Sequence, residues 1–265
     1  MPYETILYEV KDHIGYLTLN RPEALNAFNR QMTADIIDCC GKINDDPEVR
    51  VVILTGAGDR AFSAGLDLKE RAATVEVSLV ENRMRRVRPG MTSHHMAVSG
   101  IDRPVIGAIH GWAVGGGCEL ALACDLRVAA DNIRIGLMEV KRGIIPGAGG
   151  TQRLPRAVPL GIALEMVFTG EPLNAEQALR VGLVNYVVPR DEIIAKAEEI
   201  ARKIIENAPL AVRTVKAAVL KGLDMPLDQG IRLEADLSSL ISTSEDAKEG
   251  PKAFAEKRAP VWKGR

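Results

Sequence analysis

Two glutamates, Glu119 and Glu139, stand in apolar, glycine-rich stretches of this 265-residue chain. A carboxylate in such surroundings is costly unless it is paired or used. Three glycines, Gly115 to Gly117, separate a strand-like run from the helix-like run that carries Glu119. Glycines at such a junction allow a sharp turn and leave free N–H groups at the helix N-terminus, where negative charge is favoured. The stretch therefore combines an anion-stabilising backbone with two candidate acid–base groups.

A second glycine-containing stretch, Ala64-Gly65-Leu66-Asp67, could present another backbone N–H. Two such donors that converge on one carbonyl oxygen form an oxyanion hole. The alternative is that both stretches are simply tight turns, and the glycines alone do not decide between the two. The spacing of Gly111 and Gly115 does not match a dinucleotide fingerprint, and no Lys-Ser or Lys-Thr follows the glycines as in a phosphate-binding loop.

The two glutamates also have structural alternatives. Glu119 could be the ion-pair partner of an arginine such as Arg127 or Arg153, and Glu139 could begin a short helix. Two carboxylates beside a possible oxyanion hole nevertheless favour chemistry, because such a pair can hold a water molecule and divide acid from base duty.

The elements that would position these groups follow a strand–strand–helix rhythm. Ile6–Glu9 and Ile14–Leu19 predict a hairpin, and Met32 to Ile43 falls at helical spacing. Further buried strands are expected at Val51–Leu54, Val105–Ile109, Leu126–Ala129, Ile133–Gly136 and Leu183–Val188. Helical periods dominate after Gly150, at Leu160–Phe168, Ala175–Val181, Ile193–Glu206, Leu210–Lys221 and Leu227–Ile241. We expect an α/β core over residues 1–190, which carries the site, and a C-terminal helical oligomerisation region over residues 191–265.

Composition narrows the possible partners. The chain has 34 basic and 35 acidic residues, so its net charge does not favour binding to nucleic acid or to a membrane surface. Its four cysteines lack zinc-site spacing and are expected to be free thiols in a reducing compartment. No signal peptide or membrane-spanning run is visible in the sequence, so a cytoplasmic location is expected. The adjacent His94 and His95 have no cysteine or acid at ligand spacing, and no metal site is expected.

Several motifs together resemble the enoyl-CoA hydratase (crotonase) family, in the right order over essentially the whole chain. They are Asn20–Ala27, Ala61–Lys69, Gly115–Asp125, Gly143–Leu154 and, in the tail, Glu249–Arg258. The resemblance implies a crotonase-like spiral of ββα units with a C-terminal helical trimerisation region. It also implies a homo-oligomer, either a trimer or a dimer of trimers.

The same resemblance implies an activity and a set of site residues. The N–H groups of Leu66 and Gly116 would polarise a thioester carbonyl, and Glu119 and Glu139 would catalyse the syn addition of water to 2-trans-enoyl-CoA. The product would be a 3-hydroxyacyl-CoA, as in fatty-acid β-oxidation. The substrate would need no separate cofactor, since coenzyme A is part of it. The residues that match the coenzyme A channel are Ala24, Ala64, Asp67 and Lys69.

Three departures from the family pattern keep other reactions open. Leu66 stands where alanine is common, Met138 stands where proline is frequent, and Lys141-Arg142 adds charge. Together with Ala121–Asp125 and the tail, Lys141-Arg142 resembles the branch that contains methylglutaconyl-CoA hydratase, which also binds AU-rich RNA, so RNA binding is the rival function from another class. The basic run Arg83–Arg88 could be a solvated helix face, a contact to the phosphates of coenzyme A, or a site for RNA or an acidic acyl group. A 3-enoyl/2-enoyl-CoA isomerase is the other alternative within the family.

Overall fold

Two β-sheets carry the site in the computed structural model, which describes residues 2–68, 70 and 93–265. The larger sheet has the strand order β1-β2-β3-β5-β7-β9, and the smaller one has the order β4-β6-β8. Only β1 runs antiparallel to its neighbour; the other described pairings are parallel. The large sheet consists of β1 (Ile6–Lys11), β2 (Ile14–Leu19), β3 (Val51–Gly56), β5 (Val105–Ile109), β7 (Leu126–Ala130) and β9 (Tyr186–Val188). The small sheet consists of β4 (Ala61–Ser63), β6 (Trp112–Val114) and β8 (Arg134–Gly136).

Consecutive strands divide regularly between the two sheets. In the pairs β3–β4, β5–β6 and β7–β8, the first strand joins the large sheet and the second joins the small one. The large-sheet strands β3 and β5 are buried along nearly their whole length, as their unbroken apolar runs predicted. The β3–β4 and β5–β6 connections both end beside α5 (Gly116–Ala123), which contacts β4 and β6. The repeated ββα arrangement therefore places two chain segments beside the start of one helix.

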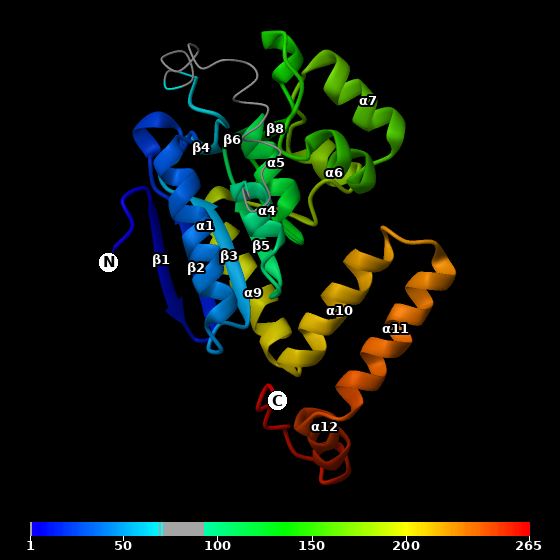
Figure 1. Ribbon diagram of the computed structural model, residues 1–265. Coiled ribbons are helices and arrows are strands. Elements are labelled where there is room, and N and C mark those ends of the chain that lie inside the picture. The colour runs from blue at the N-terminus through cyan, green and yellow to red at the C-terminus, as the bar shows by residue number, and fades with distance from the viewer. Residues whose placement is uncertain (1, 69, 71–92) are drawn as a thin grey trace.

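Helices cover the large sheet from both sides. α9 (Ile193–Ile205) packs on β3, β5 and β7. α1 (Arg30–Asp45), α4 (His94–Ser99) and α5 pack on one another, as Figure 1 shows. α1 begins where the side chain of Asn29 accepts a hydrogen bond from Met32 N at 2.8 Å, which is an N-cap.

Two helices have no predicted counterpart. These are α6 (Gly150–Ala157) and α12 (Glu245–Ala255), which contain Pro155 and Pro251 respectively. Both prolines lie beyond the first turn, where each removes one intrahelical N–H donor, so a proline in the sequence is an unreliable signal for the end of a helix. The remaining helical segments before the C-terminal arm are α7 (Leu160–Thr169), α8 (Ala175–Arg180), η1 (Pro22–Ala24), η2 (Glu139–Arg142) and η3 (Arg190–Glu192).

The predicted strand at Leu183–Val188 is shorter in the structure, where β9 covers only its second half. Leu183 N and Val184 N both donate to Ala178 O, at 2.9 and 3.3 Å. The first half of the apolar run therefore closes the end of α8 after Gly182, whose φ of +78° is left-handed.

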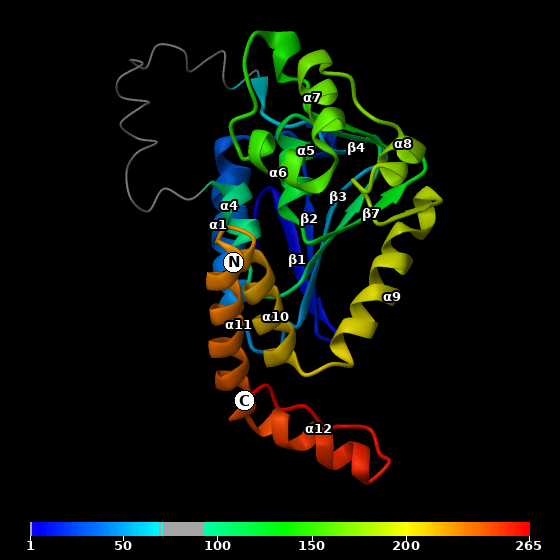
Figure 2. The ribbon, with the colours of Figure 1, turned by 90° about the vertical axis from the view of Figure 1, so that its right-hand side faces the viewer.

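The C-terminal arm extends away from the sheets. α10 (Pro209–Gly222) and α11 (Leu227–Ser242) form an antiparallel pair, with α12 beyond them, as Figure 2 shows. Lys216 Nζ lies 2.6 Å from Asp125 Oδ2, and Arg213 pairs with Asp102, so two ion pairs join α10 to the core. The division of the chain at residue 190 stays a prediction. α9 follows this residue in the sequence but packs on the large sheet, whereas α10 to α12 project away from the sheet.

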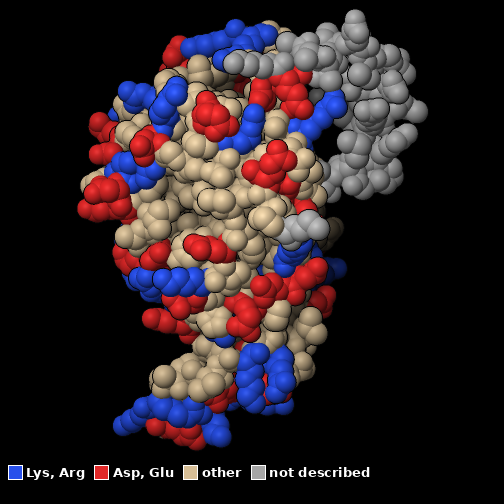
Figure 3. Space-filling model, turned by 90° about the vertical axis from the view of Figure 1, so that its left-hand side faces the viewer, with Lys and Arg blue, Asp and Glu red and all other residues tan. Residues whose placement is uncertain are grey.

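The described surface is mixed in charge. On the face shown in Figure 3, acidic and basic residues lie interspersed around an uncharged centre. The four cysteines are free and buried. Among the described residues, no helix has the length and apolarity needed to cross a bilayer.

Candidate active site

The first candidate donor is the N–H of Leu66, which follows β4. Its neighbours are fixed by Phe28, because Phe28 N donates to Gly65 O at 2.7 Å and Asp67 N donates to Phe28 O at 3.0 Å. The Leu66 N–H itself makes no hydrogen bond to any residue that the structure describes. The Leu66 side chain is 48% exposed, so this peptide lies at the surface and is accessible to a ligand.

The second candidate donor is the N–H of Gly116, the first residue of α5. Its position at the helix N-terminus leaves this N–H without an intrahelical acceptor. Gly115, with φ +56° and ψ −125°, adopts a backbone conformation that only glycine reaches easily. The bend at Gly115 turns the chain from β6 into α5.

The two donor segments lie against each other with no side chain between them. A Cβ on Gly65 would stand 2.8 Å from Gly116 N, and a Cβ on Gly117 would stand 2.1 Å from Ser63 O. Both distances are shorter than real Cβ contacts allow, so glycine is required at both positions. The sequence prediction of two glycine-bounded backbone sites thus corresponds to one place in the fold.

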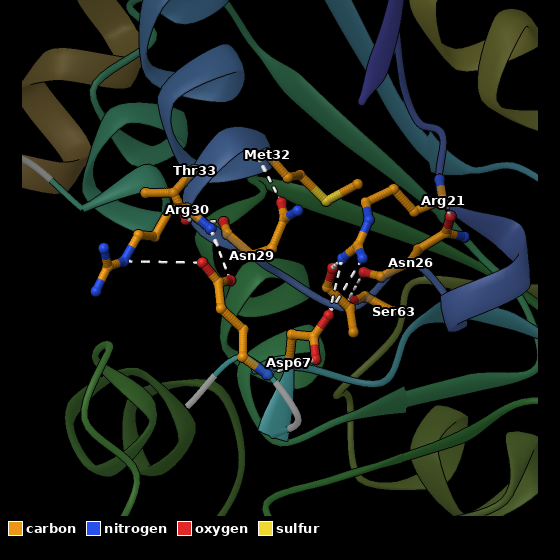
Figure 4. Close-up of polar contacts among 10 residues, drawn as sticks. Arg21, Asn26, Asn29, Arg30, Met32, Thr33, Ser63 and Asp67 are labelled. Atoms are coloured by element: carbon orange, nitrogen blue, oxygen red, sulfur yellow. Dashed lines mark hydrogen bonds and ion pairs between the residues drawn. The ribbon is translucent and has the colours of Figure 1, made fainter. Parts of the chain in front are cut away.

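A buried polar network holds the Leu66 segment from the other side. Ser63 Oγ donates to Asn26 O at 2.8 Å and accepts from Gly65 N at 3.1 Å. The fully buried amide of Asn26 donates to Ala57 O and Ala61 O, at 3.0 and 2.9 Å. Figure 4 shows Asn26 and Ser63 beside the ion pair of Arg21 with Asp67, whose closest atoms are 3.2 Å apart. This network fixes the peptide planes around Leu66.

Glu119 is a buried carboxylate held by backbone amides. Its side chain is 3% exposed, and Oε1 accepts hydrogen bonds from Ala148 N at 2.7 Å and Gly150 N at 2.8 Å. Its Oε2 makes no hydrogen bond to a described residue. One oxygen is therefore anchored, and the other remains available to a small molecule.

Neither of the two arginines proposed as ion-pair partners takes that role within the described chain. Arg127 donates to the carbonyls of Leu183 and Cys124, at 2.6 and 2.8 Å. Arg153 donates to Ala148 O at 3.0 Å and to Ser99 Oγ at 3.1 Å. The structural alternative for Glu119 as an arginine partner is therefore wrong for both residues.

Glu139 lies on the other side of the helix N-terminus. It begins η2, as its structural alternative predicted, but its side chain faces the glycine turn: a Cβ on Gly115 would be 3.5 Å from Glu139 Oε1. Glu139 Oε2 is buried without a hydrogen-bond partner in the described structure. A buried carboxylate oxygen that lacks a partner is unusual, which makes Glu139 a candidate functional residue.

Burial raises the pKa of both carboxyl groups. Desolvation is the main cause at Glu119, where the amides of Gly150 and Ala148 and the charge of Arg153 oppose it. Desolvation also raises the pKa of Glu139, and the negative charge of Glu119 raises it further. An ionised Glu119 therefore makes ionisation of Glu139 less favourable.

The predicted coenzyme A channel residues have different surroundings. Ala64 N donates to Leu25 O at 3.0 Å, which places Ala24 and Ala64 on neighbouring segments. Asp67 is engaged by Arg21 and also accepts from Glu70 N at 3.3 Å. Lys69 and the basic run Arg83–Arg88 lie outside the described residues.

Comparison with known proteins identifies the family of this chain. A family model described as enoyl-CoA hydratase/isomerase matches residues 9–265. The chain belongs to this family. It is 44% identical to an (E)-benzylidenesuccinyl-CoA hydratase of Thauera aromatica, over 98% of this chain and 99% of the relative. It is 42% identical to a crotonyl-CoA hydratase of Syntrophomonas wolfei, over 97% of each chain. A crystal structure of an enoyl-CoA hydratase from Bacillus anthracis superposes with a TM-score of 0.91 at 40% identity, over 99% of this chain and 100% of that one. The predicted crotonase fold is confirmed.

Within this enoyl-CoA hydratase/isomerase family member, sequence reasoning missed several residues of the site. Ala148 and Gly150 hold Glu119 through backbone N–H groups, which carry no side-chain signature. Asn26 and Arg21 stand in the first motif of the resemblance, but the sequence assigned them no role. The buried His95 contacts Gly116 and was considered only as a metal ligand.

The contact between Gly117 and Ser63 yields a first prediction. Gly117→Ala places a methyl group against the Ser63 carbonyl, which must push the two donor segments apart. Because a displacement of about 1 Å costs roughly 10²-fold in rate, we expect hydration of a 2-enoyl-CoA to fall by about that factor. Gly161→Ala is the matched control, since Gly161 lies in α7 with nothing within 4 Å of its Cβ position. A Gly117→Ala enzyme as active as the control would contradict the close packing.

The raised pKa of Glu139 yields a second prediction, about stability. The folded state holds this proton more tightly than the unfolded chain does, so its contribution is complete below the unfolded pKa and is lost as the pH rises through the folded pKa. Glu139→Gln removes the buried charge and should raise the apparent melting temperature at about pH 8, where an ordinary glutamate is ionised. This gain in melting temperature should shrink as the pH is lowered toward the ordinary pKa of a glutamate, because the parent carboxyl group is then protonated as well.

Glu119→Gln is the comparison variant, because Oε1 of Glu119 is compensated by two N–H donors. It should gain less stability than Glu139→Gln in the same calorimetric scans. A Glu139→Gln protein that is less stable than the parent at every pH would show that the carboxylate has a partner in the folded state.

Proposed function

We propose that this protein is an enoyl-CoA hydratase, a hydro-lyase that reversibly adds water to 2-trans-enoyl-CoA thioesters to give 3-hydroxyacyl-CoA. One observation supports it above the others: the backbone segments that carry the Leu66 and Gly116 N–H groups pack against each other, and near them are the buried Glu119 and the half-buried Glu139, both with raised pKa values. Family membership and relatives named as hydratases agree with this activity.

The two N–H groups supply electrostatic stabilisation in the proposed reaction. When the thioester oxygen accepts both hydrogen bonds, electron density is drawn away from C3 and negative charge is stabilised on the oxygen as C2 becomes enolate-like. The donors are fixed before the substrate arrives, so little free energy is lost in orienting them. The thioester itself makes the α-position acidic, so the reaction requires no redox cofactor, and coenzyme A enters as part of the substrate.

The glutamates divide the proton transfers. Glu119, ionised and anchored through Oε1, takes a proton from water through Oε2 as the water oxygen bonds to C3. Glu139, protonated, gives its proton to C2, which completes the addition to the double bond. One proton is taken and one is given, so the cycle closes when a proton passes from Glu119 to Glu139. The opposite protonation states fit two interacting carboxyl groups that cannot both ionise easily.

We further propose that Ala24, Ala64, Asp67 and Lys69 line the channel for coenzyme A, as their match to the family motif implies. Asp67 would act there through Arg21, with which it is paired, because its carboxylate already has this cationic partner.

We also propose a homo-oligomer, a trimer or a dimer of trimers, whose contacts involve the C-terminal arm. This arm carries large apolar side chains that are more than half exposed in the single chain. They are Val215, Val219, Leu223, Leu227, Ile231 and Leu240. An exposed apolar surface of this extent usually marks an interface.

The mechanism predicts the effect of removing either proton-transfer group. Glu119→Gln and Glu139→Gln each keep the side-chain shape and should each lower kcat by about 10²–10⁴-fold with little change in KM. Loss of the conjugated enoyl-thioester absorbance measures the rate. Near-normal hydration by either variant would remove that residue from the mechanism, and a Glu119→Gln enzyme that still shifts a 3-enoyl-CoA to a 2-enoyl-CoA would favour an isomerase.

The exposed apolar surface of the C-terminal arm predicts an oligomer that charged substitutions would dissociate. The double variant Val219→Asp, Leu223→Asp places charges in the apolar surface and should shift sedimentation at micromolar concentration from an oligomer to a monomer. Leu7→Asp is the control, because Leu7 is similarly exposed (55%) but lies on the edge strand β1. A parent protein that sediments as an active monomer would end the proposal.

A further inference from the structure

One buried side chain reaches the back of the proposed oxyanion hole. His95, on α4, is 4% exposed, and its Nε2 lies 2.9 Å from the carbonyl oxygen of Gly116. Gly116 is the residue whose N–H is proposed to hold the thioester oxygen. The imidazole therefore contacts the donor residue itself, from the side opposite to the N–H.

The chemistry of the contact assigns the proton. A carbonyl oxygen can only accept, so His95 Nε2 must carry a hydrogen and donate it. Burial lowers the pKa of His95 to about 4, so the ring is neutral near pH 7 and Nδ1 is without a proton. Nδ1 is buried with no partner in the described structure, so the bond to Gly116 is the one hydrogen bond this ring makes there.

The neighbouring His94 has a different contact. Its Nδ1 lies 3.2 Å from Thr33 Oγ1, and that hydroxyl already donates to Asn29 O at 3.0 Å. His94 therefore donates through Nδ1, to α1 and not to the helix that carries the site. The two rings have centroids 3.9 Å apart and share the same buried layer, so they differ mainly in what they hydrogen-bond.

A second residue packed against the two histidine rings, Phe28, also lies against Gly116. The Phe28 ring lies 4.3 Å from His94 and 5.6 Å from His95, centroid to centroid, and a Cβ on Gly116 would be 3.4 Å from it. Phe28 also fixes the Leu66 segment through its backbone. The cluster thus packs behind both donor segments: Phe28 bonds to the Leu66 segment through its backbone, and His95 bonds to Gly116 through its side chain.

We propose that His95 is a positioning residue of the oxyanion hole: its Nε2–H holds the Gly116 carbonyl, which fixes the Gly116–Gly117 peptide at the start of α5 and, through it, the neighbouring Gly115–Gly116 peptide that carries the donor N–H. The inference rests on the proposed function, because it names how one of the two donors of that site is oriented. It gives a role to a buried polar group that hydrophobic packing alone does not require, since an apolar ring would fill the same space without an unpaired nitrogen.

The test separates the hydrogen bond from packing by amide geometry. In His95→Gln the amide nitrogen can take the place of Nε2 and still donate to Gly116 O, whereas in His95→Asn the shorter amide stops near Nδ1 and cannot reach. His95→Phe keeps the ring and removes every donor. His94→Phe is the matched control, since it removes the neighbouring histidine and its bond to Thr33 but leaves Gly116 untouched.

Two readouts are needed. Hydration of crotonyl-CoA gives kcat and KM, and binding of p-dimethylaminocinnamoyl-CoA reports carbonyl polarisation as a red shift of its absorption. We expect His95→Phe and His95→Asn to lower kcat by about 10- to 100-fold, which is no more than the roughly 10²–10³-fold loss that follows complete removal of an oxyanion donor, with KM changed less than about twofold. The red shift should shrink in both, and His95→Gln should restore both quantities to near the parent values. His94→Phe should leave the red shift unchanged.

Specific outcomes would overturn the proposal. A full red shift in a folded His95→Asn, or equal losses of kcat in the His94 and His95 variants with the red shift intact, would reduce His95 to packing. If His95→Phe fails to fold, the Asn and Gln pair decides alone. A parent protein that binds the chromophore with a red shift but does not hydrate crotonyl-CoA would sink the proposed hydration, while the Asn and Gln comparison of the red shift would still test His95.

Discussion

The site depends on the direct packing of two backbone segments, Ser63 to Leu66 and Gly115 to Gly117. No side chain can stand between them, because a methyl group on Gly65 or Gly117 would overlap backbone atoms of the other segment. This contact joins the end of β4 to the start of α5 and fixes two N–H groups with respect to each other. The ββα repeat makes the contact possible, because it brings the ends of successive small-sheet strands to one edge. Glycine is therefore required at these positions mainly because it lets the two backbones approach closely, and only secondarily because its backbone is flexible.

The electrostatics of the site follow from the same contact. An N-terminus of a helix favours negative charge, and Glu119 and Glu139 both lie near that of α5, where the thioester oxygen is proposed to bind. The two carboxylates are treated differently. Glu119 receives two amide N–H groups on one oxygen, whereas Glu139 has a buried oxygen with no partner among the described residues. This difference supports the proposal that Glu119 is the more easily ionised group and Glu139 the proton donor.

Much of this arrangement could be predicted from the sequence, and the rest has physical reasons for escaping prediction. Apolar periodicity was enough for the strands of the large sheet and for α1, α7 and α9 to α11, since burial dictates those patterns. The glycine runs and the two glutamates marked the site because both are costly in ordinary structure. The anchors of Glu119 are amides of Ala148 and Gly150, which any residue could supply, so no residue type reveals them. The sequence assigned His95 no role, because it shows the imidazole but not the Gly116 carbonyl that lies beside it. Lys69 and the Arg83–Arg88 run stay predictions, since they lie outside the described residues.

The central claim is that Leu66 N–H and Gly116 N–H bind one thioester oxygen between the two glutamates. A crystal structure of the protein with acetoacetyl-CoA, a thioester that cannot be hydrated, tests it most directly. The account predicts the thioester oxygen at about 2.7–3.1 Å from both nitrogen atoms, with Glu119 and Glu139 on the two sides of the acyl C2–C3 bond. A thioester oxygen that is bound elsewhere, with either N–H facing water or protein, would contradict it.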